Sequence, residues 1–172
     1  PVVVIATIEE ATQYVVSPQY VISQSVHLEV SQSIERDELL EKLVKIGYER
    51  VDQVEQRGHF SVRGDIFDIF PVNSDDPIRM EFFGDEIDTM RHFSVDTQRS
   101  IEMVDAYTVT PFFLTSDDAD STLLSYAKDG LIIYDEPVRI QEALKKFLKE
   151  DATHRKQHCE WSELQRSVEA KI

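Results

Sequence analysis

One short stretch, residues 78–83, constrains the fold more than any other part of this chain. Its residues alternate in the order Ile78, Arg79, Met80, Glu81, Phe82 and Phe83. Successive side chains of a β-strand point to opposite faces, so the pattern predicts an apolar inner face and an outer face with Arg79, Glu81 and Phe83. Core burial accounts for the inner face. Folding alone does not require an aromatic ring beside two charges, and that combination is typical of protein interfaces.

The neighbouring residues predict a small sheet beside one helix. Residues 37–46 place Leu39, Leu40, Leu43, Val44 and Ile46 on one helical side. Gly47 can end this helix in a left-handed cap. Strands are expected at residues 60–62, 65–70, 78–83 and 87–93, with a polar loop at 71–77 and a tight turn at 84–86. Antiparallel strands beside a helix predict an α+β module.

The flanks predict an α/β arrangement around that module. Residues 2–5 and 131–134 are short apolar runs typical of strands buried on both faces. Thr7 and Glu10 have the spacing of a capping box. Residues 121–128 are expected to be helical, and Pro137 suits the first position of a further helix.

Two helices are expected near the carboxyl end. After Pro137, one helical face carries Ile140, Leu144, Phe147 and Leu148. Residues 152–172 are polar and predict a helix around Trp161 and Leu164.

Composition narrows the classes of function. Lys and Arg number 18 against 33 Asp and Glu, which gives a formal charge of −15, and residues 1–35 contain no Lys or Arg. Such a surface repels phosphate backbones, so we expect no direct nucleic-acid binding. The single cysteine, Cys159, excludes an internal disulfide framework and fits a reducing cytoplasm. The longest apolar run, residues 2–6, is too short to span a membrane. A start at Pro1 without a signal peptide suggests a fragment of a longer protein.

Candidate catalytic and metal sites are weak. Asp135 and Glu136 follow an apolar run, as acidic pairs do in nucleoside triphosphatases, but the phosphate-binding loop is missing. The simpler interpretation is an acidic cap at a helix start. His154, His158 and Cys159 have helical spacing for zinc but no fourth ligand nearby, so we expect solvent-facing polar residues. We therefore predict no catalytic residue, no cofactor and no metal.

Five residues remain as candidates for a protein-binding site. They are Arg50, Arg63, Arg79, Glu81 and Phe83. Phe60 and Val62 are expected in the core, so Ser61 and Arg63 face the same side as Arg79 if their two strands pair. The alternative is a solvated face with local ion pairs, each worth about 0 to 1 kcal/mol. Spacing alone leaves both open, and Phe83 favours the interface.

Three stretches give these residues a specific resemblance. They are Gly47–Val54 (GYERVDQV), Arg63–Pro71 (RGDIFDIFP) and Glu81–Asp88 (EFFGDEID). The chain resembles the UvrB-like module of bacterial transcription-repair coupling factors (Mfd) over essentially its whole length. The excinuclease subunit UvrB is the near rival. Residues 96–100 and Ser61 look like the coupling factor rather than UvrB.

The resemblance implies a domain division and a partner. Residues 1–32 look like the end of a helicase-like domain 1a, 33–112 like domain 2, and 113–172 like the start of domain 1b. The module is then inserted between parts of a degenerate helicase-like α/β domain that has lost its ATP site. Domain 2 of these families binds UvrA, the damage-recognition subunit of nucleotide excision repair. The family's contacting residues match Arg50, Arg63, Arg79, Glu81 and Phe83.

The resemblance also implies properties of a longer parent protein. That parent is an ATP-driven DNA translocase that displaces stalled RNA polymerase and recruits UvrA, so its partners include polymerase and duplex DNA. Its own carboxy-terminal domain covers the UvrA-binding surface until polymerase is engaged. An alternative is a nucleotide-dependent helicase fragment.

Overall fold

A computed structural model describes residues 3–114, 119–127 and 130–169 of the chain. The chain divides into two compact units. The central unit is Val21–Leu114, and the flanking unit combines Pro1–Tyr20 with Thr115–Ile172. The domain boundaries expected at residues 32/33 and 112/113 stay a prediction.

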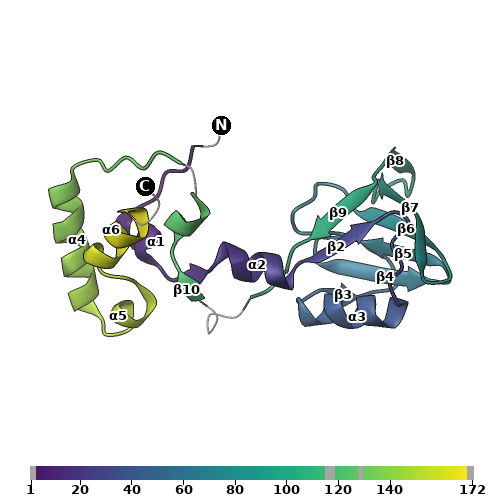
Figure 1. The fold of residues 1–172 in the computed structure, drawn as a ribbon, viewed down its shortest axis with the longest axis horizontal. Coiled ribbons are helices and arrows are strands. Elements are labelled where there is room, and N and C mark those ends of the chain that lie inside the picture. Colours follow the sequence, from purple (N-terminus) through teal and green to yellow (C-terminus); the bar gives the residue numbers. More distant parts are fainter. Residues whose placement is uncertain (1–2, 115–118, 128–129, 170–172) are drawn as a thin grey trace. The chain divides into compact units, whose positions relative to one another are not determined.

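The central unit is a mixed α+β structure (Figure 1). Its helix is α3 (Arg36–Lys45), and α2 (Pro18–Gln24) ends inside it. Its strands are β2 (Val26–Glu29), β3 (Glu49–Arg50), β4 (His59–Arg63), β5 (Ile66–Ile69), β6 (Ile78–Phe83), β7 (Glu86–Phe93), β8 (Ser100–Met103) and β9 (Ala106–Val109).

Six of these strands form one sheet in the order β3-β4-β5-β6-β7-β8. All neighbours pair antiparallel except β3 and β4, which are parallel. The four predicted strands correspond to β4 to β7. The predicted alternation of residues 78–83 is confirmed, because Ile78, Met80 and Phe82 are buried and the intervening residues are not. The predicted α+β module is therefore present.

The core of the central unit lies on the inner face of this sheet. Buried side chains come from α3, from the β2–β9 pair and from the sheet: Val26, Leu28, Leu39, Leu43, Phe60, Phe67, Ile69, Ile78, Met80, Phe82, Ile87, Met90 and Val109. The rings of Phe60 and Phe67 stack with centroids 5.9 Å apart. Figure 1 shows α3 beside β3 and β4.

Helix α3 begins one residue before its expected start, and Gly47 follows it with φ +93°, as predicted. Leu39 and Leu43 are fully buried. Val44 was expected on the same buried side, but it is 59% exposed. The reason is helical geometry, since the Leu39–Leu43 row faces the sheet while Val44 lies one residue round the helix, about 100° away.

Four strands of the central unit were not predicted from the sequence: β2, β3, β8 and β9. Strand β2 pairs with β9 in the register Val26↔Val109, 83 positions apart in the chain. Burial alternates along β2, with Val26 and Leu28 inside and His27 and Glu29 outside. This period-two pattern was a usable signal.

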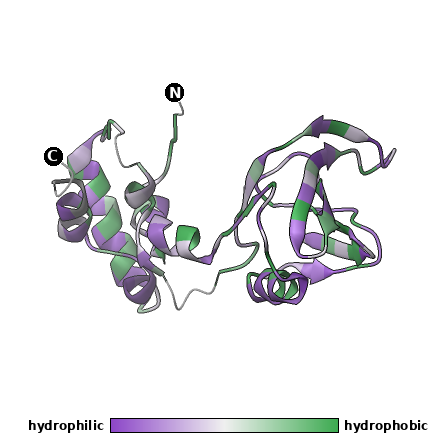
Figure 2. Cartoon of the chain, turned by 45° about the vertical axis from the view of Figure 1, so that its right-hand side comes forward, coloured by the Kyte–Doolittle hydropathy of each residue, from purple (hydrophilic) through white to green (hydrophobic). Residues whose placement is uncertain are grey.

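The flanking unit consists mainly of helices. Its elements are α1 (Ile8–Thr12), β1 (Val15–Val16), β10 (Ala119–Ser121), the 3₁₀ helix η2 (Leu123–Tyr126), α4 (Pro137–Glu150), α5 (His154–Gln157) and α6 (Trp161–Glu169). Hydrophobic and hydrophilic bands alternate along its longest helix, α4 (Figure 2). The capping box of Thr7 and Glu10 and the helix start at Pro137 are confirmed.

The prediction of two strands in the flanking unit is wrong. Residues 3–5 and 131–134 have no regular secondary structure and pair with no strand among the described residues, and Ile5 is 92% and Leu131 87% exposed. An apolar β-branched run is a strand only where neighbours bond its backbone groups. Residues 1–2 lie outside the described part. The helix expected at 121–128 is shorter, because Ser121 pairs with β1 and only residues 123–126 are helical. Lys128 lies outside the described residues.

The described part of the flanking unit has one antiparallel sheet of two strands, β1 and β10. Leu144, Cys159 and Leu164 are buried. The helicase-like α/β domain stays a prediction. In the part of the chain that the structure describes, none of the helices combines the length and apolar character needed to cross a bilayer.

Candidate protein-interaction surface

The outer face of the six-stranded sheet carries a row of polar residues at matching positions. Ser61 of β4 pairs with Asp68 of β5, Asp68 with Arg79 of β6, and Arg79 with Arg91 of β7. Paired residues of neighbouring strands point to the same face, so these four side chains lie on one line across the sheet. Arg63 was expected beside Arg79 on condition that their two strands pair. Strands β4 and β6 do not pair directly, because β5 lies between them.

Asp68 is the centre of this row. Its side chain is only 1% exposed. Arg79 donates from Nε to Oδ1 at 2.7 Å and from Nη2 to Oδ2 at 2.8 Å, and Arg63 donates from Nη2 to Oδ2 at 2.7 Å. A buried carboxylate must be paired, and the two-point fork of Arg79 is a strong form of pairing. Asp68 therefore fixes both arginines.

Arg79 is held by more than Asp68. Its Nη2 also donates to Oε1 of Gln98 at 3.0 Å, and its guanidinium lies 4.3 Å from the centroid of the Phe93 ring. Gln98 has φ +57°, a left-handed conformation that is uncommon outside glycine. The hydrogen bonds that Arg79 donates to the Asp68 carboxylate raise the pKa of the Arg79 guanidinium. The Arg79 side chain is 14% exposed, so little of it is accessible to a partner, and its main role is to stabilise the fold by pairing with Asp68.

Glu81 forms a second charge pair on the same face. Arg91 donates to Oε1 of Glu81 and from Nη1 to Thr89 Oγ1. The hydrogen bond from Arg91 lowers the pKa of Glu81. The Glu81 side chain is 41% exposed and remains open to further contact.

Phe83 is the most exposed of the four predicted residues on this face. It lies at the end of β6 opposite Glu86 and is 83% exposed. Gly84 follows with φ +65° and turns the chain into β7. The structure thus puts Arg63, Arg79, Glu81 and Phe83 on the outer face, as expected from the alternation.

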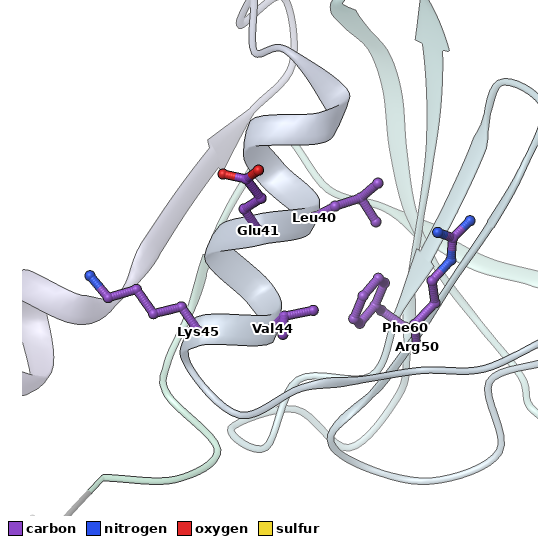
Figure 3. A pocket seen from close by; sticks show the side chains of 6 residues that line it. All are labelled: Leu40, Glu41, Val44, Lys45, Arg50 and Phe60. Atoms are coloured by element: carbon purple, nitrogen blue, oxygen red, sulfur yellow. The ribbon is translucent and has the colours of Figure 1, made fainter.

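Arg50 lies elsewhere. In the parallel ladder it pairs with Phe60, a fully buried residue of the inner face. It therefore points to the α3 side at the edge of the sheet, where it lines a groove with residues of α3 (Figure 3). The five predicted residues do not form one continuous face.

Sequence reasoning missed Asp68, Arg91 and the burial of Ser61. Asp68 lies between the buried residues Phe67 and Ile69, and a carboxylate there is a recognisable signal of an outward position. Ser61 was expected on the surface, but it is 1% exposed and its Oγ has no hydrogen-bond partner among the described residues. Ser61 pairs with Asp68, which in turn pairs with Arg79, so it lies beside these larger side chains on the outer face.

The flanking unit contains the other candidates. Glu136 is the N-cap position of α4, but its side chain makes no capping bond and accepts from Arg139 at 2.7 Å instead. The expectation that His154, His158 and Cys159 face solvent is wrong. His154 stacks on Phe147, His158 lies 3.0 Å from the Glu9 carbonyl, and burial raises the pKa of the Cys159 thiol to about 11. Residues 3–114, 119–127 and 130–169 contain no group of three or more His, Cys, Asp or Glu arranged to hold a metal.

Comparison with known proteins shows which sequences this chain is similar to. Residues 26–113 match the family model described as the UvrB interaction domain. The chain is 44% identical over 89 residues to the transcription-repair-coupling factor of Bacillus subtilis (strain 168), which is 52% of this chain and 8% of the relative. It is 33% identical over 146 residues to that of Escherichia coli (strain K12), which is 84% of this chain and 13% of the relative.

A second group of relatives has a different name. The chain is 39% identical over 136 residues to UvrABC system protein B of Streptococcus suis (strain 98HAH33), covering 77% of this chain and 20% of the relative. This chain therefore spans at most about a fifth of these curated relatives. The matches confirm the resemblance drawn from residues 47–54, 63–71 and 81–88.

Proposed function

Because the chain belongs to the UvrB interaction domain family, we propose that its central unit is a binding module for UvrA. The module contributes no catalytic group in this proposal. It presents a preformed surface to a protein partner of nucleotide excision repair.

The exposed ring of Phe83 beside an ordered charge cluster carries this proposal. Phe83 is 83% exposed on the same face as Arg63 and Glu81, whose side chains are 48% and 41% exposed. Arg63 uses Nη2 for Asp68, which leaves its other donors for a partner carboxylate. A rigid apolar anchor next to a charge that is already oriented loses little entropy on binding.

We infer a larger role from the coupling-factor relatives. In that role the whole protein is an ATP-driven DNA translocase that engages lesion-stalled RNA polymerase and recruits UvrA through this module. The flanking unit then belongs to a helicase-like domain without an ATP site. UvrABC system protein B is the alternative parent. In our proposal the same surface binds UvrA whichever parent the chain comes from.

Calorimetric titration with purified UvrA tests the binding proposal. Phe83→Ala and Arg63→Ala should each lower the affinity by about 2 to 4 kcal/mol, the range of an interface hot spot. Asp75→Ala is the control, because Asp75 is a fully exposed loop residue whose ion pair, within the described residues, is with the half-exposed Arg57. Unchanged affinity in both test variants, with the fold intact by circular dichroism, contradicts the proposed face.

Two further titrations separate the competing classes. A fluorescent ATP analogue should show no saturable binding, whereas a nucleotide-dependent helicase fragment would bind it. Labelled duplex DNA should give no salt-sensitive anisotropy change, because a chain of charge −15 repels phosphates. UvrA affinity should decrease moderately as salt rises, since charged pairs contribute to binding.

A further inference from the structure

The six-stranded sheet of the central unit ends at one side with the open edge of β8. Within the described residues no strand pairs with the other side of β8, which Figure 1 shows beside β7 at the rim of the unit. All four β8 residues are exposed, and two are apolar: Ile101 is 52% and Met103 65% exposed. The opposite edge strand, β3, consists of the charged residues Glu49 and Arg50. Natural proteins usually protect open edges with charges or proline, so the apolar residues of β8 indicate a binding edge.

The backbone of Met103 faces this open edge. Val104 donates its N–H to the Met90 carbonyl of β7 at 3.0 Å, and Met103 lies directly opposite Arg91. Neighbouring pairs of an antiparallel ladder alternate between hydrogen-bonded and non-hydrogen-bonded, so Arg91 and Met103 form a non-hydrogen-bonded pair. The N–H and C=O of Met103 therefore point away from β7, toward the position that a further strand would occupy.

The Met103 side chain extends the outer face of the sheet. Arg91 pairs with Arg79 of β6 on one side and with Met103 on the other, so all three side chains point to that face. Arg91 also donates to Glu81, which lies two residues before Phe83 on β6. A path of adjacent side chains thus leads from Phe83 through Glu81 and Arg91 to Met103.

Size and charge indicate which partner fits this edge. A specific protein interface involves about 20 to 30 residues of each partner, so binding on the outer face must extend well beyond Phe83, Arg63 and Glu81. A second copy is a poor occupant, because two chains of net charge −15 repel each other and pairing of β8 with β8 would bring like-charged Glu102 residues together. A partner strand with a basic residue opposite Glu102 is complementary instead.

We propose that the UvrA partner adds an extended segment to the β8 edge. Its backbone bonds to Met103, its apolar side chains contact Met103 and Ile101, and a basic side chain pairs with Glu102. The inference rests on the proposed function and gives the partner a backbone-mediated contact that is continuous with the contact at Phe83. In such strand addition the main-chain bonds supply affinity, and the side chains along the strand supply specificity.

The first test removes the outward N–H of Met103 and leaves the strand in place. UvrA is titrated calorimetrically into the full chain carrying Met103→Pro, with Met103→Leu as the matched control. Proline is tolerated on an edge strand where the N–H faces solvent, so the fold should survive, and circular dichroism checks this. Met103→Pro should lower the affinity about tenfold, while Met103→Leu keeps the N–H and an apolar side chain and should stay within about twofold. Equal affinities of the two variants overturn the proposal.

Hydrogen exchange of the unsubstituted chain tests the same contact without a variant. Saturation with UvrA should slow exchange of the Met103 amide about tenfold or more, because the added segment accepts its N–H. The Glu102 amide faces β7 in the alternating ladder, so it is the internal reference and should change less. An unchanged exchange rate of the Met103 amide in the complex overturns the proposal.

The third test reads the charge of the occupant. Glu102→Lys should weaken UvrA binding about tenfold, because it places a like charge against the basic side chain. Glu142→Lys is the matched control, since it makes the same change of net charge at an exposed residue of α4 in the flanking unit. It should leave the affinity within about twofold. Unchanged or tighter binding by Glu102→Lys overturns the proposal.

The outcomes separate this inference from the proposed function. If Phe83→Ala weakens UvrA binding and Met103→Pro does not, the β8 inference fails while the proposed function stands. If neither weakens it, the proposed function fails as well. A chain that self-associates in sedimentation, and loses this in Met103→Pro without a change in UvrA affinity, has a second copy at β8, which also overturns the proposal.

Discussion

One buried carboxylate, Asp68, sets the charge arrangement of the outer face. It is 1% exposed and receives three hydrogen bonds from two arginines. The interface interpretation treats Arg63 and Arg79 alike, but the structure distinguishes them. Arg79 is 14% exposed and Arg63 is 48% exposed, so Arg79 mainly neutralises Asp68 and Arg63 is the arginine with surface left for a partner.

This distinction predicts different effects on stability. Arg79→Ala leaves Asp68 buried with one partner and should lower the free energy of unfolding by about 3 kcal/mol. Arg63→Ala leaves the two-point fork of Arg79 in place and should lower it by less than about 1 kcal/mol. Urea unfolding of each variant measures both values. Equal losses would contradict the unequal roles of the two arginines.

A double variant provides the control for Arg79. Asp68→Leu with Arg79→Met replaces both charged partners by apolar side chains, so no unpaired charge stays buried. It should be more stable than Arg79→Ala alone. Part of any loss of UvrA affinity in Arg79→Ala comes from the disturbed sheet. The affinity of the double variant, which lacks Arg79 but keeps no unpaired buried charge, separates that part from the loss of the arginine itself.

The neighbouring pair Phe82 and Phe83 tests the strand register. Phe82 is 5% exposed and packs on Phe67, with ring centroids 6.2 Å apart. Phe82→Ala should lower the free energy of unfolding by about 3 to 5 kcal/mol, and Phe83→Ala should change it by less than about 0.5 kcal/mol. Thermal or urea unfolding checks this. The reverse order would mean that β6 is shifted by one residue.

Two glycines show how turns position the elements around the site. Gly84 has φ +65° and open space where a Cβ would lie, so Gly84→Ala should cost only the strain of a left-handed residue, about 1 to 2 kcal/mol. Gly47 has φ +93°, and a Cβ there would lie 2.9 Å from the Phe113 Cβ. Gly47→Ala should therefore destabilise more than Gly84→Ala in urea unfolding. Equal effects would indicate that Phe113 moves aside freely.

Local patterns predicted the elements whose partners are close in sequence. Strands β4 to β7 pair with their neighbours in chain order, β4 with β5 and β6 with β7 through two-residue turns and β5 with β6 through the loop at residues 70–77, and alternation marks β6 clearly. The alternation of β2 could have marked it as a strand, but its pairing with β9, from Val26 to Val109, is a long-range contact that no local pattern specifies. Residues 3–5 and 131–134 show the opposite error, because a suitable pattern does not supply a pairing strand.

Local patterns also predicted only part of the candidate site, because the rest depends on which strands pair. Alternation correctly placed Arg79, Glu81 and Phe83 on one side of β6. It could not place Arg50, whose side depends on its pairing with Phe60. It also could not reveal that Asp68 joins Arg63 to Arg79, because that contact depends on β5 lying between β4 and β6.

At the scale of the whole molecule, two units have separate buried cores. The central core gathers around residues such as Phe67 and Met80, and the flanking unit buries Leu144, Cys159 and Leu164. Units with their own cores commonly unfold as separate cooperative transitions. The one tryptophan, Trp161, and the one cysteine, Cys159, both belong to the flanking unit, so each reports on that unit alone.

We therefore predict that Phe82→Ala and Leu144→Ala affect different transitions. Phe82→Ala should lower the urea concentration at which the β6 amides lose their protection from hydrogen exchange. It should leave unchanged the urea midpoint of the unfolding transition measured by Trp161 fluorescence. Leu144 is 1% exposed in α4, so Leu144→Ala should lower the Trp161 midpoint through a loss of about 2 to 5 kcal/mol and leave the β6 midpoint unchanged. Thiol labelling of Cys159 should follow Trp161, because burial raises its pKa to about 11 and the reactive thiolate forms readily only on opening. A shift of both midpoints by either variant would mean that the chain unfolds as one cooperative body.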